Sequence, residues 1–142
     1  MGKVYHIETI SELKPSNIEG TGVFSTQKLN IGDIIITYHK IVTDEESMNS
    51  KYAHPTGAKI RRELSLPKDP SKSALIATDN SKYFNHSKAN ANLQKLEVTS
   101  NTMIYTVIKD INIGDELLYD YHTKESLKWD ETANKITVSY SN

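Results

Sequence analysis

The segment KYFNHS at residues 82–87 is the stretch from which the fold of this chain can be read. Two aromatic residues precede three polar ones, Asn85, His86 and Ser87, a pattern that a buried strand does not require. An asparagine side chain can hydrogen-bond its own backbone in a tight turn, and a neutral histidine offers one donor and one acceptor. By itself the segment therefore predicts either a surface turn or a loop that holds a polar ligand. It also fits a glycosylation sequon, an interpretation that the missing secretion signal disfavours.

A second segment, GDELLYDY at residues 114–121, ends in Tyr119 and Tyr121. The INIGD turn that leads into it has the pattern of LNIGD at residues 29–33, and the strand predicted after that earlier turn ends in Tyr38. The shared motif is too short a repeat to indicate a duplication. Tyrosine rings and hydroxyls at strand ends could line a narrow channel for an alkyl amine. Three core tyrosines with satisfied hydroxyls are the alternative, and composition alone favours that alternative.

Short apolar segments separated by turn residues predict a mostly β domain, in the α+β class with little helix. The segments are rich in β-branched residues, and Gly, Pro, Asn and Asp gather between them. Residues 42–70 instead mix charged residues with Pro and Gly, so we expect a variable insert there, with one or two helical turns at 60–66. The expected strands are residues 4–10, 34–38, 73–78, 93–98, 102–109 and 136–140.

The composition limits the possible partners and chemistries. A chain of 142 residues is the size of one domain, and its net charge of −1, from 17 basic and 18 acidic residues, gives no electrostatic case for nucleic acid or a membrane. The absence of cysteine excludes a disulfide framework, a thiolate zinc site and a cysteine nucleophile. Residues 1–10 lack the apolar segment of a secretion signal, and we expect a cytoplasmic or nuclear protein.

Several catalytic motifs are missing from the chain. The five histidines form neither HExxH nor HxH, so we expect no metal. No GxSxG elbow for a hydrolase and no GxxxxGK[ST] loop for a nucleoside triphosphatase is present. The glycines of GTG at residues 20–22 mark an unusual or closely approached backbone, but the third glycine of a dinucleotide fingerprint is absent.

Taken in order, four segments resemble the SET-domain protein lysine methyltransferases. They are GTGVF at residues 20–24, GD at 32–33 followed by Tyr38, KYFNHS at 82–87 and GDELLYDY at 114–121. The resemblance covers residues 4–122. It implies a SET fold of several small sheets with a C-terminal pseudoknot, in which residues 82–87 thread through a loop made by 114–121. The implied division is a minimal SET domain at 1–122, with its variable insert at 42–70, and a tail at 123–142 that covers the cofactor or substrate site.

The resemblance also implies the cofactor, S-adenosylmethionine, which leaves as S-adenosylhomocysteine, with no metal. In the family a glycine loop contacts this cofactor through its backbone, which corresponds here to Gly20, Thr21 and Gly22. The family's Asn-His pair binds the amino-acid and adenine parts of the cofactor, which corresponds here to Asn85 and His86.

The implied reaction is methyl transfer to the side-chain amine of lysine in a protein substrate, a histone or another protein. Tyr121 corresponds to the family's catalytic tyrosine and Tyr119 to its Tyr/Phe switch, where a tyrosine implies mono-methylation. Tyr38 and Tyr119 would line the lysine channel. Trp129 in the tail is a candidate lid, or an aromatic residue packed on the domain edge. A SET-like protein-binding module that has lost turnover is the alternative function.

The sequence departs from the family just after the Asn-His-Ser triplet. The family reads Asn-His-Ser-Cys-x-Pro-Asn, whereas residues 85–92 here read NHSKANAN, without the proline. The family's second asparagine could therefore correspond to Asn90 or to Asn92, and the sequence leaves both open. Lys82 stands where the family has arginine, and after Tyr38 the family's Gly-Glu is replaced by Lys40 and Ile41.

Overall fold

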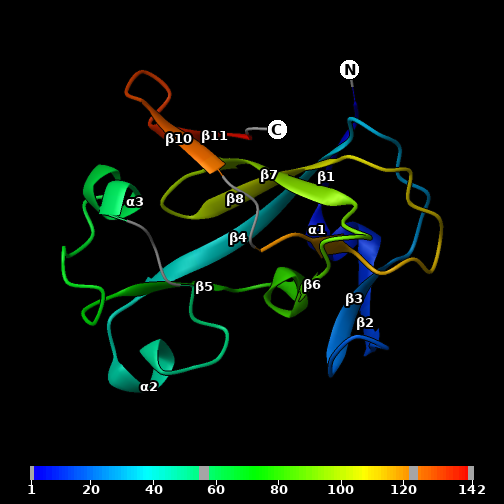
Figure 1. The fold of residues 1–142 in the computed structure, drawn as a ribbon, viewed down its shortest axis with the longest axis horizontal. Coiled ribbons are helices and arrows are strands. Elements are labelled where there is room, and N and C mark those ends of the chain that lie inside the picture. The colour runs from blue at the N-terminus through cyan, green and yellow to red at the C-terminus, as the bar shows by residue number, and fades with distance from the viewer. Residues whose placement is uncertain (1, 55–57, 122–124, 141–142) are drawn as a thin grey trace.

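The structure, a computed structural model, describes residues 2–54, 58–121 and 125–140, and it consists mainly of short strands (Figure 1). The helical segments are α1 (Ile7–Ile10), α2 (Glu45–Met48), α3 (Ala58–Glu63) and the 3-10 turn η1 (Asn80–Tyr83). The strands are β1 (Val4–His6), β2 (Ser11–Pro15), β3 (Thr21–Ser25), β4 (Ile34–Val42), β5 (Ala74–Ala77), β6 (Asn85–His86), β7 (Leu93–Val98), β8 (Thr102–Val107), β9 (Leu118–Tyr119), β10 (Glu125–Asp130) and β11 (Lys135–Tyr140).

Nine of these strands form one hydrogen-bonded sheet, whose main path has the order β1-β4-β8-β7-β11-β10. Strand β5 pairs with β4, and the two-residue strand β9 pairs with both β6 and β7. Strands β2 and β3 form a separate two-stranded sheet, at the opposite end of the molecule from α3 (Figure 1). The expectation of a mostly β fold with little helix is confirmed. Among the described residues, no helix has the length and apolar character needed to cross a membrane.

The two turns with the shared motif pair with each other through an antiparallel bridge. Leu29 and Ile111 exchange both backbone hydrogen bonds, each at 2.9 Å. In each turn an aspartate side chain, Asp33 or Asp115, accepts a hydrogen bond at 2.8 Å from the backbone N–H three residues earlier. The motif shared by residues 29–33 and 111–115 therefore corresponds to two turns of the same local structure that lie side by side. One turn leads into β4 and the other into β9, so the pairing sets where the strands that carry the tyrosines begin.

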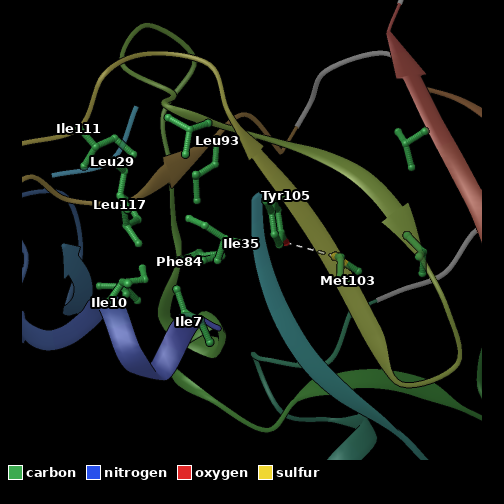
Figure 2. Close-up of a cluster of buried hydrophobic side chains, with 14 of the residues drawn as sticks. Ile7, Ile10, Leu29, Ile35, Phe84, Leu93, Met103, Tyr105, Ile111 and Leu117 are labelled. Carbon is green, nitrogen blue, oxygen red and sulfur yellow. Dashed lines mark hydrogen bonds between the residues drawn. The ribbon is translucent and has the colours of Figure 1, made fainter. Parts of the chain in front are cut away.

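The N-terminal segment differs from the continuous strand expected at residues 4–10. Strand β1 ends at His6, and residues 7–10 form the helix α1. Ile7 and Ile10 are each 1 % exposed in the main core. Side chains three residues apart share one face of a helix but point to opposite faces of a strand, so only a helical turn buries both against the same core. Figure 2 shows both isoleucines directed toward Ile35 and Phe84.

The main core lies between the sheet and α1 and collects side chains from both ends of the chain. Phe84, from the segment at residues 82–87, and Leu117, from the segment at 114–121, are both part of it (Figure 2). The fully buried members come mostly from strands and from the paired turns, and include Ile7, Ile10, Val23, Leu29, Ile35, Leu93, Val98, Val107, Ile111, Leu117 and Ile136. The two sequence segments are thus anchored in one hydrophobic cluster.

The C-terminal residues 125–140 form a hairpin that extends the sheet. Strand β11 pairs with β7, with Ile136 opposite Val98, and β10 pairs with β11 (Figure 1). The terminal strand expected at residues 136–140 is present as β11, one residue longer at its start. Residues 122–124, which include His122 and the first part of the predicted tail, lie outside the described residues.

Candidate active site

A cleft of about 730 Å³ brings together the glycine segment, the insert, β4 and the C-terminal tyrosines. Its walls come from segments that are far apart in the sequence, and β6 brings two of them together by pairing in parallel with β9. His86 and Gly22 adjoin the lining residues in the chain, but neither lines the cleft itself. The predicted site residues that do line it are Gly20, Thr21, Tyr38, Asn85, Tyr119 and Tyr121.

Asn85 is held in one orientation by three acceptor oxygens. Its side-chain Nδ2 donates to the carboxylate of Glu116 at 2.8 Å, and to the backbone carbonyls of Glu19 at 3.1 Å and Thr21 at 3.4 Å. All three partners can only accept hydrogen bonds, so the amide nitrogen must face them. The amide oxygen of Asn85 is then left as an acceptor for a ligand that donates hydrogen bonds.

Glu116 adds a second connection between the glycine segment and Asn85, beside the direct bond from Asn85 to Thr21. Its carboxylate accepts from the hydroxyl of Ser16 at 2.8 and 3.0 Å as well as from Asn85. A Cβ atom placed on Gly22 would lie 2.4 Å from the Glu116 carboxylate, so only glycine allows this approach. Sequence reasoning did not single out Glu116, although its place in residues 114–121 was a signal that could have identified it.

His86 positions Tyr121 from outside the cleft. The backbone N–H of Tyr121 donates to Nδ1 of His86 at 2.9 Å, so that nitrogen carries no proton. The two rings also pack against each other, with centroids 5.0 Å apart. The structure thus places His86 next to the predicted catalytic tyrosine, as a support of its backbone.

Asn92 ties the loop after the Asn-His-Ser triplet to the C-terminal motif. Asn92 is 8 % exposed, and its side chain donates to the backbone carbonyl of Glu116 at 2.9 Å and accepts from the backbone N–H of Leu118 at 2.9 Å. Asn90 is exposed, and only its backbone N–H bonds to the hydroxyl of Ser87, at 2.9 Å. Of the two asparagines that the sequence left open, Asn92 is therefore the one that connects the two motifs.

An aromatic group surrounds the predicted catalytic tyrosine. The ring of Tyr119 has its centroid 4.5 Å from that of Tyr121, 5.6 Å from that of Tyr105 and 6.1 Å from that of Phe84. The hydroxyl of Tyr121 donates to the backbone carbonyl of Phe84. Tyr105 was missed in the sequence because it lies in an ordinary-looking strand and carries no motif.

The hydroxyl of Tyr121 stays protonated at neutral pH. Burial raises the pKa of Tyr121 above its usual value, and the nearby carboxylates of Glu19 and Glu116 raise it further. A tyrosine in this state is a hydrogen-bond donor, and here the donated proton points to the Phe84 carbonyl. The lone pairs of the hydroxyl oxygen remain as acceptors.

Tyr38 lines the cleft, but its hydroxyl turns toward the N-terminal segment. The hydroxyl lies 3.1 Å from Nδ1 of His6, and the two rings stack with an interplanar angle of 6° and a centroid distance of 5.9 Å. Tyr38 is 38 % exposed. Tyr38 therefore belongs to the rim of the cleft, apart from the aromatic group around Tyr119.

Trp129 does not line the cleft. It lies in β10 opposite Ile136 and packs, partly buried, against the main core. This position favours the packing alternative over the lid. In the part of the chain that the structure describes, no cluster of three or more His, Cys, Asp or Glu side chains could hold a metal ion.

The chain is similar to known proteins in sequence and in fold. The SET domain family model matches residues 20–122. The chain is 32 % identical over 111 residues to the N-lysine methyltransferase KMT5A of Xenopus tropicalis, which covers 72 % of this chain and 33 % of that protein. The chain thus spans a third of the length of this relative.

Two solved structures have a similar fold. A candidate histone methyltransferase of Plasmodium falciparum, PFL0690c, is 20 % identical with a TM-score of 0.53, covering 81 % of this chain and 95 % of that one. The Polycomb repressive complex 2 of Chaetomium thermophilum bound to S-adenosylmethionine is 21 % identical with a TM-score of 0.57, covering 80 % of this chain and 15 % of that one. At this level of identity, the likeness concerns the fold.

Proposed function

The chain belongs to the SET-domain family, and from this premise we propose that it transfers a methyl group from S-adenosylmethionine to the side-chain amine of a protein lysine. One observation carries the proposal. A single cleft joins the protonated Tyr121 and its aromatic neighbours to Asn85 and the glycine segment at residues 20–22. An alkyl amine could thus lie against the rings while a polar cofactor lies against Asn85.

The residues of the cleft suit this cofactor. When bound, S-adenosylmethionine supplies an electrophilic methyl group on a positively charged sulfur. The amide oxygen of Asn85 is oriented to accept from an ammonium group, because three acceptors hold the amide nitrogen on the other side. The carboxylates of Glu19 and Glu116 lie close enough to raise the pKa of Tyr121, and the same negative charge favours a cationic ligand.

The aromatic group suits a lysine side chain. The rings of Phe84, Tyr105, Tyr119 and Tyr121 provide apolar contact for its methylene groups. Free lysine has a pKa of about 10.4 and must lose a proton before it can attack, and removal from water lowers that pKa. The lone pairs of the Tyr121 hydroxyl can accept weak CH···O contacts from a polarised methyl group. Holding the amine in line supplies much of the rate acceleration.

We further propose that the product is mono-methyl lysine. Tyr119 packs against three aromatic rings, with centroid distances from 4.5 to 6.1 Å, and this packing would hold its hydroxyl in place in the lysine channel. Its hydroxyl would occupy part of the space beside the amine. Mass spectrometry of the products tests this: mainly mono-methyl lysine is expected, and a rise in dimethyl product is expected for Tyr119→Phe. Mainly trimethyl product from the natural sequence would contradict it.

Calorimetry with S-adenosylhomocysteine, combined with transfer of labelled methyl groups to histones and a cell lysate, tests the function. Tyr121→Phe is expected to reduce turnover by about 100-fold, the usual order for removing one polar group aimed at a transition state. Tyr5→Phe is the matched control, because Tyr5 packs on the main core away from the cleft, and it should leave turnover unchanged. Cofactor binding without transfer to any substrate would favour the alternative, a SET-like binding module.

A further inference from the structure

Among the residues that the structure describes, three lysines line the cleft; two of them face one tyrosine ring and the third faces another. The Nζ atoms of Lys51 and Lys82 lie 5.1 and 4.8 Å from the ring centroid of Tyr52, in the insert. The Nζ atom of Lys95 lies 5.6 Å from the ring centroid of Tyr119. A lysine ammonium is attracted to the face of a tyrosine ring at these distances. Of the three, Lys95 is the one whose amine lies at the proposed lysine-binding rings.

The backbone of Lys95 is fixed on three sides. Leu93, two residues earlier on the same face of β7, pairs with Tyr119 of β9. Lys95 itself lies opposite Tyr105 of β8, and its carbonyl accepts a hydrogen bond at 2.7 Å from the hydroxyl of Tyr140 in β11. The starting point of the Lys95 side chain is therefore fixed relative to Tyr119. Its position places a lysine amine at Tyr119 in each molecule, without any binding step.

We propose that Lys95 is an internal methylation site, an inference that rests on the proposed function. The deprotonated Nζ of Lys95 forms the new bond to the methyl carbon of S-adenosylmethionine. The electron pair of the broken carbon–sulfur bond stays on sulfur, which becomes the neutral thioether of S-adenosylhomocysteine. The proton lost by the amine passes to water. Because nucleophile and site belong to the same chain, the transfer is intramolecular.

The modified side chain would stay at the same rings. Methylation keeps the positive charge of lysine, and aromatic faces bind methylated ammonium groups well. Methyl-Lys95 would then compete with an incoming substrate lysine for the space beside Tyr119. Incubation with S-adenosylmethionine alone should therefore slow the later transfer to a substrate peptide.

The test is to incubate the full chain with methyl-labelled S-adenosylmethionine and no other substrate, and to map the label by mass spectrometry after cleavage at acidic residues. Label is expected on Lys95, at a rate per molecule that does not change with protein concentration. Lys51 and Lys82 are internal controls. Because a misplacement of about 1 Å costs about 100-fold in rate, they should be labelled at least that much more slowly. Lys95→Arg should remove the label from the chain.

The outcomes separate this inference from the function on which it rests. Label on a substrate protein but not on Lys95 would overturn the internal site and leave the proposed function intact. Label mainly on Lys51 or Lys82, or undiminished label in Lys95→Arg, would also overturn it. The absence of transfer to any lysine, internal or external, would overturn both.

A measurement without cofactor tests the contact itself. Lys95→Met, Tyr119→Leu and the double variant are compared by urea unfolding. Groups in direct contact give non-additive changes in the unfolding midpoint, whereas independent groups give additive ones. Non-additive shifts are expected. Additive shifts would show that Lys95 and Tyr119 are not in contact in solution, which would contradict the internal site.

Discussion

Replacing Asn92 by alanine should separate the two motifs that form the site. The side chain of Asn92 lies between the loop after residues 85–87 and the C-terminal motif, with hydrogen bonds of 2.9 Å to the backbone of Glu116 and of Leu118. Asn92 is 8 % exposed, so water does not replace these bonds readily. The substitution Asn92→Ala removes both hydrogen bonds and does not prevent the backbone of the loop from taking the same conformation.

The expected loss of stability follows from those two bonds. A typical hydrogen bond contributes about 1 kcal/mol net, and a buried backbone group left without a partner costs about 1–3 kcal/mol. Leu118 is buried, so its backbone N–H would be a buried group left without a partner. Together the terms predict that Asn92→Ala lowers the free energy of unfolding by about 2–4 kcal/mol. This is a large fraction of the total stability of a small domain.

Urea unfolding of the natural chain, Asn92→Ala and Asn90→Ala measures the effect. Asn90 is the matched control, because it is also an asparagine of the same loop but is exposed. A surface substitution of this kind usually stays within about 0.5 kcal/mol. Calorimetry with S-adenosylhomocysteine on the folded variants should also show weaker binding for Asn92→Ala, since Glu116, which orients Asn85, loses its support.

The reasoning would be refuted if Asn92→Ala and Asn90→Ala lost the same stability within error. It would also be refuted if Asn90→Ala were the more damaging change. Either result would mean that the loop is held by its backbone rather than by the Asn92 side chain, and that the two motifs are joined without it.

Two further substitutions test the surroundings of the cleft. Gly22→Ala should weaken S-adenosylhomocysteine binding in calorimetry, because the added Cβ would lie 2.4 Å from the Glu116 carboxylate and displace it from Asn85; unchanged affinity would contradict this. Burial lowers the pKa of His39 in the folded chain below its usual value of about 6.5. When the pH falls through about 6.5, His39 therefore takes up a proton more readily in the unfolded chain than in the folded chain. The free energy of unfolding then decreases as the solution is acidified. His39→Gln should therefore lose less stability than the natural chain between about pH 7 and 5 in urea unfolding, and equal losses would contradict the assignment.

The sequence by itself determined the features that depend on local chemistry. The turns at residues 29–33 and 111–115 could be recognised, although not their pairing, because Asn, Gly and Asp favour turn geometry through their own backbone and side chain. The strands β5, β7, β8 and β11 were predicted within two residues of their bounds, since β-branched residues and turns mark them locally, whereas β2, β3, β6 and β10 were not predicted. The two motifs at 82–87 and 114–121, and their order, were sufficient to identify the family.

The tertiary structure alone decided how those features meet. Asn92 could not be chosen over Asn90 from the sequence, because their difference lies in contacts with Glu116 and Leu118, far along the chain. From the sequence, Trp129 could equally be a lid over the cleft or an aromatic residue packed on the domain. In the structure its position in β10 packs it against the main core.

Lys95 carried no signal at all, since a lysine in an alternating strand looks like any solvent-facing residue. These outcomes depend on pairings between segments distant in sequence, and such pairings are set by the common burial of the core rather than by any local preference.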